Sequence, residues 1–296
     1  MQSKFLDLNG HQFFVRSWGD PSLPPLLMLH GFPEYGGAWG DLAPHLSQRF
    51  HCVAPDQRGY GQSWAPEGVQ NYVTSALVGD MVALIEQFGD PVTVIGHDWG
   101  AAVAYGLAMF KPALVDRLII ANGVHPVPFQ REMAAGGAQS EASQYINMLR
   151  SPEAAEVMSA NDFAGLETFF RRHLGQDWLD EATLAKYKAE WARPGRLNAM
   201  LNWYRASPLR VAAPGQPITD LAPLPLDRLQ VRCPHLLIWG PDDKALLPQS
   251  TEGLEEFADE LTRVTIPETD HWLIHQNPQA VAQAILDWIP QTGTPS

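Results

Sequence analysis

The stretch PVTVIGHDWGAAVAYGLAMF, residues 91–110, changes from a strand-like to a helix-like composition within three positions. As far as Ile95 it is an apolar, β-branched run typical of a buried strand, and beyond Asp98 it has the composition of a helix. Gly96 and Gly100 flank Asp98 two residues away on each side. Residues without a side chain let a strained backbone pass close to its neighbours. The stretch therefore predicts a strand, a very tight turn at Asp98 and a helix.

The rest of the chain repeats this order of strand and helix. Short apolar runs bounded by Gly and Pro alternate with longer stretches of helical period, which is the signature of a mainly parallel sheet covered by helices. Residues 70–88, 98–110 and 277–289 have the apolar spacing of amphipathic helices. The predicted strands are residues 12–17, 25–29, 51–55, 91–95, 117–121, 235–239 and 262–266. We therefore expect an α/β fold with helices on both faces of the sheet.

The alternation stops between about residues 126 and 215, where the chain consists of helix formers with scattered aromatic and charged residues. We interpret this stretch as a helical insertion. It leads into the proline-rich segment SPLRVAAPGQPITDLAPLPLDRL, residues 207–229, which cannot sustain a helix or a central strand because proline lacks the backbone donor. The expected organisation is a first core part over residues 1–125, a helical cap over 126–215 and a second core part over 216–296.

Composition and charge exclude several classes of function. The 296 residues are 45% hydrophobic and can bury a large core, whereas the net charge of −13 opposes binding to a nucleic-acid backbone. The N-terminal segment lacks a long apolar stretch, so we expect no signal peptide, no membrane span and a cytoplasmic location. Cys52 and Cys233 lie in strand-like apolar surroundings and are expected to be reduced. None of the ten histidines has ligand spacing, so neither a metal nor another cofactor is expected.

Asp98 occupies the position that serine holds in the G-x-S-x-G nucleophile elbow. A carboxylate can displace a leaving group at a saturated carbon, and the ester that it forms can be hydrolysed at its own carbonyl. A serine would attack an acyl carbon instead. The alternative is that Asp98 only caps the following helix, because Asp is a favoured N-cap and stabilises the helix dipole. His97, next to it, is expected to be structural.

Three ordered motifs resemble those of the α/β-hydrolases with an aspartate nucleophile, a branch that comprises epoxide hydrolases and haloalkane dehalogenases. LLMLHGFPEYGGAW (26–39) is similar to the H-G-x-P loop of that branch, DQRGYGQS (56–63) to its D-x-R-G-x-G-x-S segment, and GHDWGA (96–101) to its nucleophile elbow. The resemblance covers nearly the whole chain. It implies an α/β-hydrolase fold, in which a mostly parallel sheet carries an inserted helical cap.

The resemblance also implies roles for individual residues. The backbone N–H groups of Phe32 and Trp99 would form an oxyanion hole directed at the Asp98 carboxyl as it becomes tetrahedral. Pro33 would be a cis proline that fixes the angle at which Phe32 presents its amide. The residues of these loops expected to make buried structural hydrogen bonds are His30, Asp56 and Arg58.

His271 follows the last predicted strand, and the order nucleophile, acid, base is that of the α/β-hydrolases. By resemblance, His271 would activate the water that attacks the ester, and a buried carboxylate would fix its tautomer. The spacing to the Leu-Pro-Gln sequence that follows resembles that of the family best when this acid is Asp243, and Asp242 is the alternative, which would otherwise shape the turn. His275, further along, is expected at the surface.

The leaving group distinguishes the two chemistries of this branch. An epoxide oxygen leaves as an alkoxide and needs an acidic O–H donor, whereas a halide needs only weak N–H donors. LNWYRASP (201–208) resembles the N-W-Y-R element of epoxide hydrolases and makes Tyr204 one proton donor, and SQYINMLRSPEAAE (143–156) resembles the segment that carries the second, Tyr145. Either tyrosine could instead belong to the cap core. We therefore expect an enzyme that opens a small hydrophobic epoxide with water to a vicinal diol.

Two other functions stay open at this point. A haloalkane dehalogenase would use the same nucleophile, with the Trp99 indole as a halide donor, although many dehalogenases have Asn where this chain has Phe32. Relatives that cleave haloacids carry Arg at the positions of Trp99 and Ala102. A non-catalytic binding protein of the same fold is the other alternative, although every expected catalytic position holds a competent residue.

Overall fold

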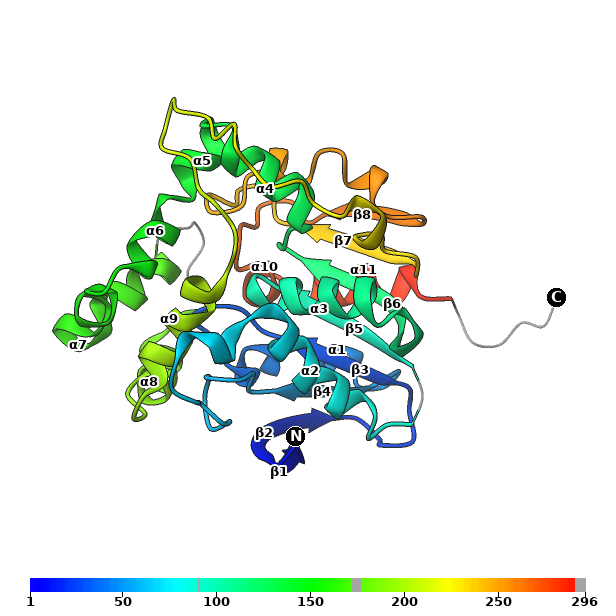
Figure 1. Cartoon of the computed structure of the whole chain (residues 1–296). Coiled ribbons are helices and arrows are strands. Elements are labelled where there is room, and N and C mark those ends of the chain that lie inside the picture. The colour runs from blue at the N-terminus through cyan, green and yellow to red at the C-terminus, as the bar shows by residue number, and fades with distance from the viewer. Residues whose placement is uncertain (90, 172–176, 291–296) are drawn as a thin grey trace.

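The computed structural model describes residues 1–89, 91–171 and 177–290, so the last six residues of the predicted second core part lie outside it. Its centre is an eight-stranded sheet of order β1-β2-β4-β3-β5-β6-β7-β8 (Figure 1). β2 pairs antiparallel with β1 and with β4, and the other neighbours pair parallel. This confirms the predicted α/β fold. The strands are β1 (Gln2–Leu8), β2 (His11–Trp18), β3 (Pro25–Leu29), β4 (His51–Pro55), β5 (Val92–His97), β6 (Val115–Ala121), β7 (His235–Trp239) and β8 (Leu261–Thr265).

Every predicted strand is present, within about two residues at its ends, but the prediction was wrong to begin the sheet at residue 12. β1 precedes it as an edge strand whose residues are mostly exposed. It therefore lacks the buried apolar run by which the other strands were recognised. Asn9 and Gly10, which join β1 to β2, both have positive φ angles, and this pair is a strong hairpin signal in a sequence.

Helices cover both faces of the sheet, as predicted. α2 (Thr74–Ile85) and α3 (Trp99–Phe110) pack on one face, and α1 (Ala43–Leu46), α10 (Leu273–Gln276) and α11 (Pro278–Trp288) pack on the other. The predicted helix over residues 70–88 is divided into a 3-10 turn and α2. The sheet is thus buried on both sides, which explains the continuous apolar runs of its central strands.

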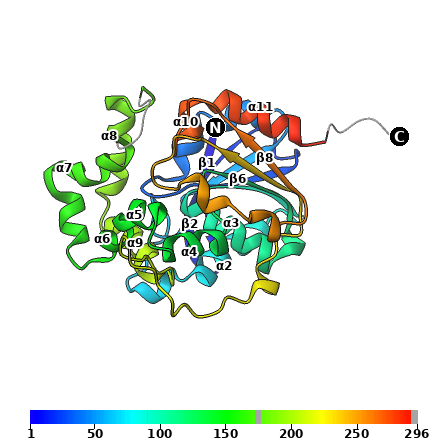
Figure 2. The same cartoon turned by 90° about the horizontal axis from the view of Figure 1, so that it is seen from above.

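The residues between β6 and β7 lie beside and above the sheet rather than in it (Figures 1 and 2). They form α4 (Pro126–Ala134), α5 (Ala138–Ala142), α6 (Gln144–Arg150), α7 (Ala154–Arg171), α8 (Glu181–Trp191) and α9 (Arg196–Ala206). α7 is kinked, because residues 160–163 leave the helical backbone conformation. The proline-rich segment 207–229, called the linker below, then returns to β7 and contains a single β-bridge between Ala213 and Gln216 and a short 3-10 turn at Leu226–Arg228. We call α4 to α9 the cap.

Buried ion pairs hold the loops at the edge of the sheet. Arg16 pairs with Asp56, and Arg58 forms two hydrogen bonds with Asp80, at 2.6 and 2.7 Å. His30 accepts a hydrogen bond from the backbone N–H of Gln57 at 3.1 Å. The residues expected to be structural therefore do make buried contacts within the fold.

Three further findings concern what the described part of the chain can bind or span. Cys52 is buried, Cys233 is half-buried, and both are free thiols, as expected. No helix among the described residues combines the length and the apolar composition that crossing a bilayer requires. Nor do three or more His, Cys, Asp or Glu side chains gather in this part of the chain as they would around a metal ion.

Candidate active site

Asp98 lies at the sharp turn between β5 and α3, with a φ of 50° and a ψ of −119°. A non-glycine residue with positive φ is uncommon, and such strain is often found where a side chain must be presented for chemistry. The backbone passes very close to itself here. A Cβ atom added to Gly96 would lie 2.6 Å from the carbonyl oxygen of Gly100. A Cβ atom added to Gly100 would lie 2.0 Å from the carbonyl oxygen of Leu29. The two glycines therefore permit the predicted tight turn.

Two backbone amides hold the Asp98 carboxyl group. The N–H of Phe32 donates to its Oδ1 at 2.7 Å, and the N–H of Trp99 is a second donor. The Phe32–Pro33 peptide bond is cis, as predicted. Burial raises the pKa of Asp98, while the imidazole of His271 and the two amides act in the opposite direction. These amides can stabilise negative charge on the carboxyl group, the Phe32 amide at Oδ1.

His271 faces the other oxygen of the nucleophile candidate. Its Nε2 lies 3.7 Å from Asp98 Oδ2, and its Nδ1 lies 2.8 Å from Asp243 Oδ2. Burial alone would lower the pKa of His271, but the charges of Asp243 and Asp98 outweigh it and raise this pKa to about 9. Asp242, the alternative acid, is exposed. The structure thus brings Asp98, His271 and Asp243 together.

Asp243 is held by more donors than the sequence predicted. Asn122 Nδ2 donates to its Oδ2 at 2.7 Å, and the backbone N–H groups of Ala245 and Leu246 donate to its Oδ1 at 2.8 and 2.9 Å. Burial would raise the pKa of Asp243, but His271 and these donors keep it below its ordinary value. Asn122 was not predicted. The feature of the sequence that could have identified Asn122 is its position directly after the strand predicted at 117–121.

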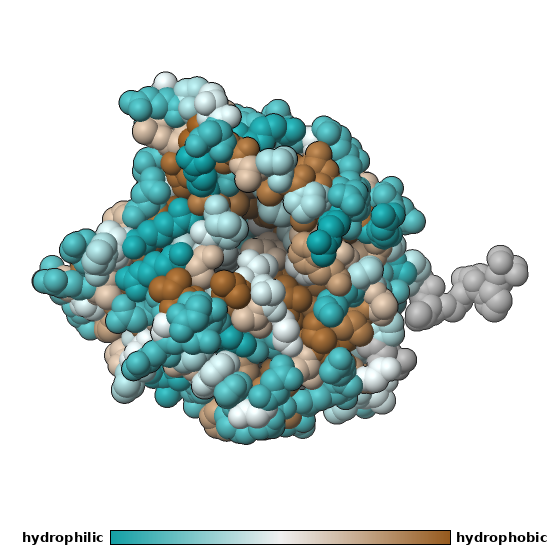
Figure 3. Space-filling view, viewed as in Figure 1, coloured by the Kyte–Doolittle hydropathy of each residue, from teal (hydrophilic) through white to brown (hydrophobic). Residues whose placement is uncertain are grey.

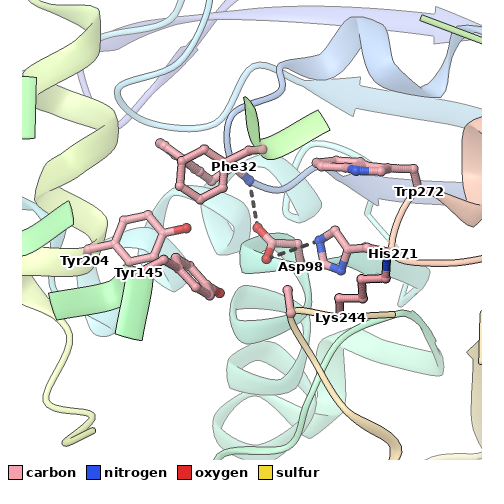
Figure 4. Close-up of a pocket in the computed structure, with 9 residues that line it drawn as sticks. Phe32, Asp98, Tyr145, Tyr204, Lys244, His271 and Trp272 are labelled. Carbon is pink, nitrogen blue, oxygen red and sulfur yellow. Dashed lines mark hydrogen bonds and ion pairs between the residues drawn. The ribbon is translucent and has the colours of Figure 1, made fainter. Parts of the chain in front are cut away.

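Tyr204 on α9 and Tyr145 on α6 point toward Asp98 from the side opposite His271 (Figure 4). Both tyrosines line a small cavity together with Asp98. The Tyr204 ring packs edge-on against the rings of Trp99 and Phe32, with centroids 5.1 Å apart in each pair. Burial, Tyr145 and Asp98 raise the pKa of Tyr204 well above 10. Its hydroxyl group is therefore protonated at neutral pH and can donate to a negative oxygen.

Behind the site lies a buried carboxylate that the sequence did not indicate. Glu34 Oε1 lies 2.7 Å from His275 Nε2 and accepts a hydrogen bond from the hydroxyl of Tyr187 at 3.0 Å. Its Oε2 lies 3.2 Å from His97 Nδ1. Burial would raise the pKa of Glu34, but His275 and His97 hold it well below its usual range. The other ring nitrogen of His97 bonds the carbonyl oxygen of His271 at 2.7 Å, so this network positions the backbone of His271.

The expectation that His275 lies at the surface was wrong, since only 8% of it is exposed. His275 is four residues after His271, and α10 carries it inward, where Glu34 compensates for its burial. Its neighbours Leu273 and Ile274 are fully buried. These two apolar residues, between His271 and His275 in the sequence, could have indicated that His275 is buried.

The cap is fixed to the loop that carries the Phe32 amide. From α8, Tyr187 donates to Glu34, and one turn later the indole N–H of Trp191 donates to the carbonyl oxygen of Pro33 at 2.6 Å. From α9, the indole N–H of Trp203 donates to the carbonyl oxygen of Arg58 at 2.9 Å. Each of these donors is buried, so the cap and the core share one interior.

Comparisons with known proteins agree with this geometry. Residues 24–278 match the family model described as the alpha/beta hydrolase fold. The chain is 32% identical to the AB hydrolase superfamily protein YfhM of Bacillus subtilis, over 98% of both chains. It is 30% identical to epoxide hydrolase 4 of Homo sapiens, over 96% of this chain and 77% of that one. A solved structure described under novel epoxide hydrolases from metagenomes of hot environments superposes with a TM-score of 0.87 at 36% identity, over 97% of both chains. The chain therefore belongs to the α/β-hydrolase family and, within it, to the group of the epoxide hydrolases.

Proposed function

We propose that this enzyme opens an epoxide to a vicinal diol through a covalent ester on Asp98. The observation that carries the proposal is the surroundings of this one carboxylate. One of its oxygens is held by the Phe32 amide, its other oxygen faces His271, and two tyrosines approach from the opposite side. The names of the relatives support the same activity.

In the first step, Asp98 Oδ2 attacks an epoxide carbon, the bond between that carbon and the epoxide oxygen breaks, and an alkyl ester forms. The oxygen leaves as an alkoxide and takes a proton from Tyr204 or Tyr145. This role needs a hydroxyl group that is protonated at neutral pH, and the hydroxyl of Tyr204 is.

In the second step, water attacks Cγ of the Asp98 ester and His271 accepts a proton from this water. Negative charge then develops on Oδ1, where the amide of Phe32 donates, and the amide of Trp99 also donates to this carboxyl group. The tetrahedral species collapses as the bond between Cγ and Oδ2, the oxygen bound to the substrate, breaks, this oxygen takes the proton of the incoming hydroxyl group, and the diol and the Asp98 carboxylate result. The proton on His271 then returns through solvent to the tyrosinate left by the first step. Because esterification removes the Asp98 charge, one cause of the raised pKa of His271 disappears. A larger fraction of the imidazole is therefore neutral, and able to accept a proton, after the first step than before it.

A haloalkane dehalogenase is the second candidate, since Trp99 lines the larger cavity beside Asp98 and carries an indole N–H. The Phe32 side chain cannot supply a second donor, and its ring packs on Tyr204. Two tyrosine hydroxyl groups are the stronger donors in this site, and they suit an alkoxide. The proposal therefore favours the epoxide.

A parallel activity screen tests the proposed function. Terminal, aryl and disubstituted epoxides are incubated beside haloalkanes and fluoroacetate, and diol and halide are both measured. We expect diol from at least one epoxide class and little or no halide. Faster bromide release from bromoalkanes than diol formation from any epoxide would replace the proposal by dehalogenation, and no product from any substrate would favour a binding protein.

The Asp243→Asn variant is expected to lose much more activity than Asp242→Asn. Of these two carboxylates, Asp243 bonds His271, so its neutralisation should remove the group that fixes the tautomer and stabilises the imidazolium. Loss of the corresponding charge in a Ser-His-Asp triad lowers kcat up to ~10⁴-fold. Single-turnover measurements should assign the loss to ester hydrolysis. A larger loss in Asp242→Asn would transfer the role to that residue.

A further inference from the structure

Two cavities of very different size meet at Asp98, and Tyr145 and Tyr204 line both of them. The smaller one holds about 30 Å³ and is closed by Lys244, His271 and other residues on the base side. The larger one has a volume of about 280 Å³ and extends away from Asp98 on the side of Trp99. An epoxide carbon at Asp98 therefore has little room on one side and a long space on the other.

The larger cavity follows helix α3 away from the nucleophile. Trp99, Ala102, Gly106, Met109 and Phe110 line it and form one stripe along this helix of 12 residues, which is about 18 Å long at 1.5 Å per residue. Small side chains at Ala102 and Gly106 leave the space open in the middle of the stripe. The cavity is thus elongated.

The opposite wall comes from the cap and the linker. Phe129 of α4, Ile146 of α6, and Leu209, Leu224 and Pro225 of the linker all line it. Among the described residues that line this cavity, Asp98 is the only one with a carboxylate, ammonium, guanidinium or imidazole group. Beyond the reaction centre, the cavity therefore offers nothing that would pair with a charged substituent.

The far end of the cavity reaches the surface between α3 and the linker. Phe110 is 44% exposed and Leu224 is 41% exposed there. Hydrophobic side chains gather near the middle of this face, over the region where α3 lies in Figure 1 (Figure 3). Phe110 and Leu224 thus form an apolar rim around the opening of the cavity, and such a rim favours the entry of an apolar chain.

We propose that the substrates are terminal epoxides with one long, slender, uncharged apolar substituent, which lies along α3 between Trp99 and Leu224. The inference rests on the proposed function and adds the substrate class. A volume of about 280 Å³ is at the lower end of the ~300–1,000 Å³ typical of ligand pockets, so the arm is thin rather than globular. The cavity on the base side is too small for a second long arm.

A series of 1,2-epoxyalkanes from epoxybutane to epoxydecane measures the apolar contact directly. We expect kcat/KM to rise about fourfold for each methylene that enters the cavity, which corresponds to ~0.8 kcal/mol per buried CH₂. The isomers 1,2-epoxydecane and 5,6-epoxydecane have the same atoms and differ only in where the ring lies. The terminal isomer should react much faster, since the internal one needs room for two arms.

Two exposed leucines of the linker supply a matched pair of variants. Leu224 lines the cavity, whereas Leu226, 48% exposed and two residues later, does not. In Leu224→Glu, the ratio of kcat/KM for epoxydecane to that for epoxybutane should fall about tenfold or more, because a carboxylate is costly to desolvate beside an alkyl chain. Leu226→Glu should keep the wild-type ratio. Ala102→Phe, which fills the middle of the cavity, should remove most of the gain with chain length.

Thermal unfolding of each variant shows whether it is folded. If Ala102→Phe does not fold, Leu224→Glu still tests the inference, because Leu224 is at an exposed position where a substitution disturbs the fold least. Epoxides that are opened with no gain from chain length, or equal ratios in the two linker variants, would overturn the inference and leave the proposed function intact. If the wild type opens no epoxide at all, the proposed function itself fails.

Discussion

Incubation of the His271→Gln variant with an epoxide is expected to leave the protein covalently alkylated on Asp98. The first step needs the Asp98 carboxylate and the tyrosines, whereas the second needs a base to activate water. Without His271 the ester should form and persist. Intact-protein mass spectrometry should show a gain of the substrate mass, and peptide mapping should locate it on the peptide that contains Asp98.

Asp98→Ala in the same His271→Gln background is the control and should show no adduct. Asp98→Ala alone should reduce turnover by several orders of magnitude, since removal of a triad nucleophile costs ~10⁶-fold in kcat in a serine protease. An adduct on another residue would contradict the assignment. So would the absence of any adduct when the wild type turns over the same epoxide.

The second large effect is expected from the two cap tyrosines. Tyr204→Phe should slow alkylation of Asp98, and the double variant with Tyr145→Phe should nearly abolish it, because general acid assistance contributes ~10²- to 10⁴-fold in rate. Both hydroxyl groups serve one oxygen, so the single losses need not add. Quenching of tryptophan fluorescence in the stopped flow can follow this step, since Trp99 is adjacent to Asp98.

Tyr72→Phe is a matched control for these variants. Its hydroxyl donates to the carbonyl oxygen of Pro66 at 2.7 Å and lies outside both cavities. It should leave the alkylation rate unchanged. If the double variant of Tyr204 and Tyr145 opened epoxides at the wild-type rate, the two tyrosines would have no part in the chemistry.

Local signals in the sequence were enough for most of the fold. The strand, glycine and helix pattern around Asp98 predicted a turn that the structure confirms in detail, because Gly96 and Gly100 are sterically required there. The buried parallel strands were recognisable since both of their faces are covered. β1 was not, because it is an exposed edge strand and an apolar run is absent from it.

The site was predictable where motifs carried it and not where distant residues meet. Asp98, His271 and Asp243 stand in a recognisable order along the chain, and the structure brings them together. Asn122 lies outside the quoted motifs and Glu34 only follows the H-G-x-P sequence, and their contacts depend on partners 121 and 241 residues away. Only the fold brings those partners within hydrogen-bond distance.

The hydrogen bonds from α8 link the position of the cap to the position of the Phe32 amide. Tyr187 and Trp191 bond Glu34 and Pro33, the two residues that directly follow Phe32. A hydrogen bond to a charged group contributes ~1.5–3 kcal/mol, so lifting α8 would be costly at Glu34 and would loosen the segment that aims the Phe32 amide. In the proposed mechanism, ester hydrolysis would therefore need α8 in contact with this segment. Substrate and product exchange through the end of the cavity at α3 would not require α8 to move.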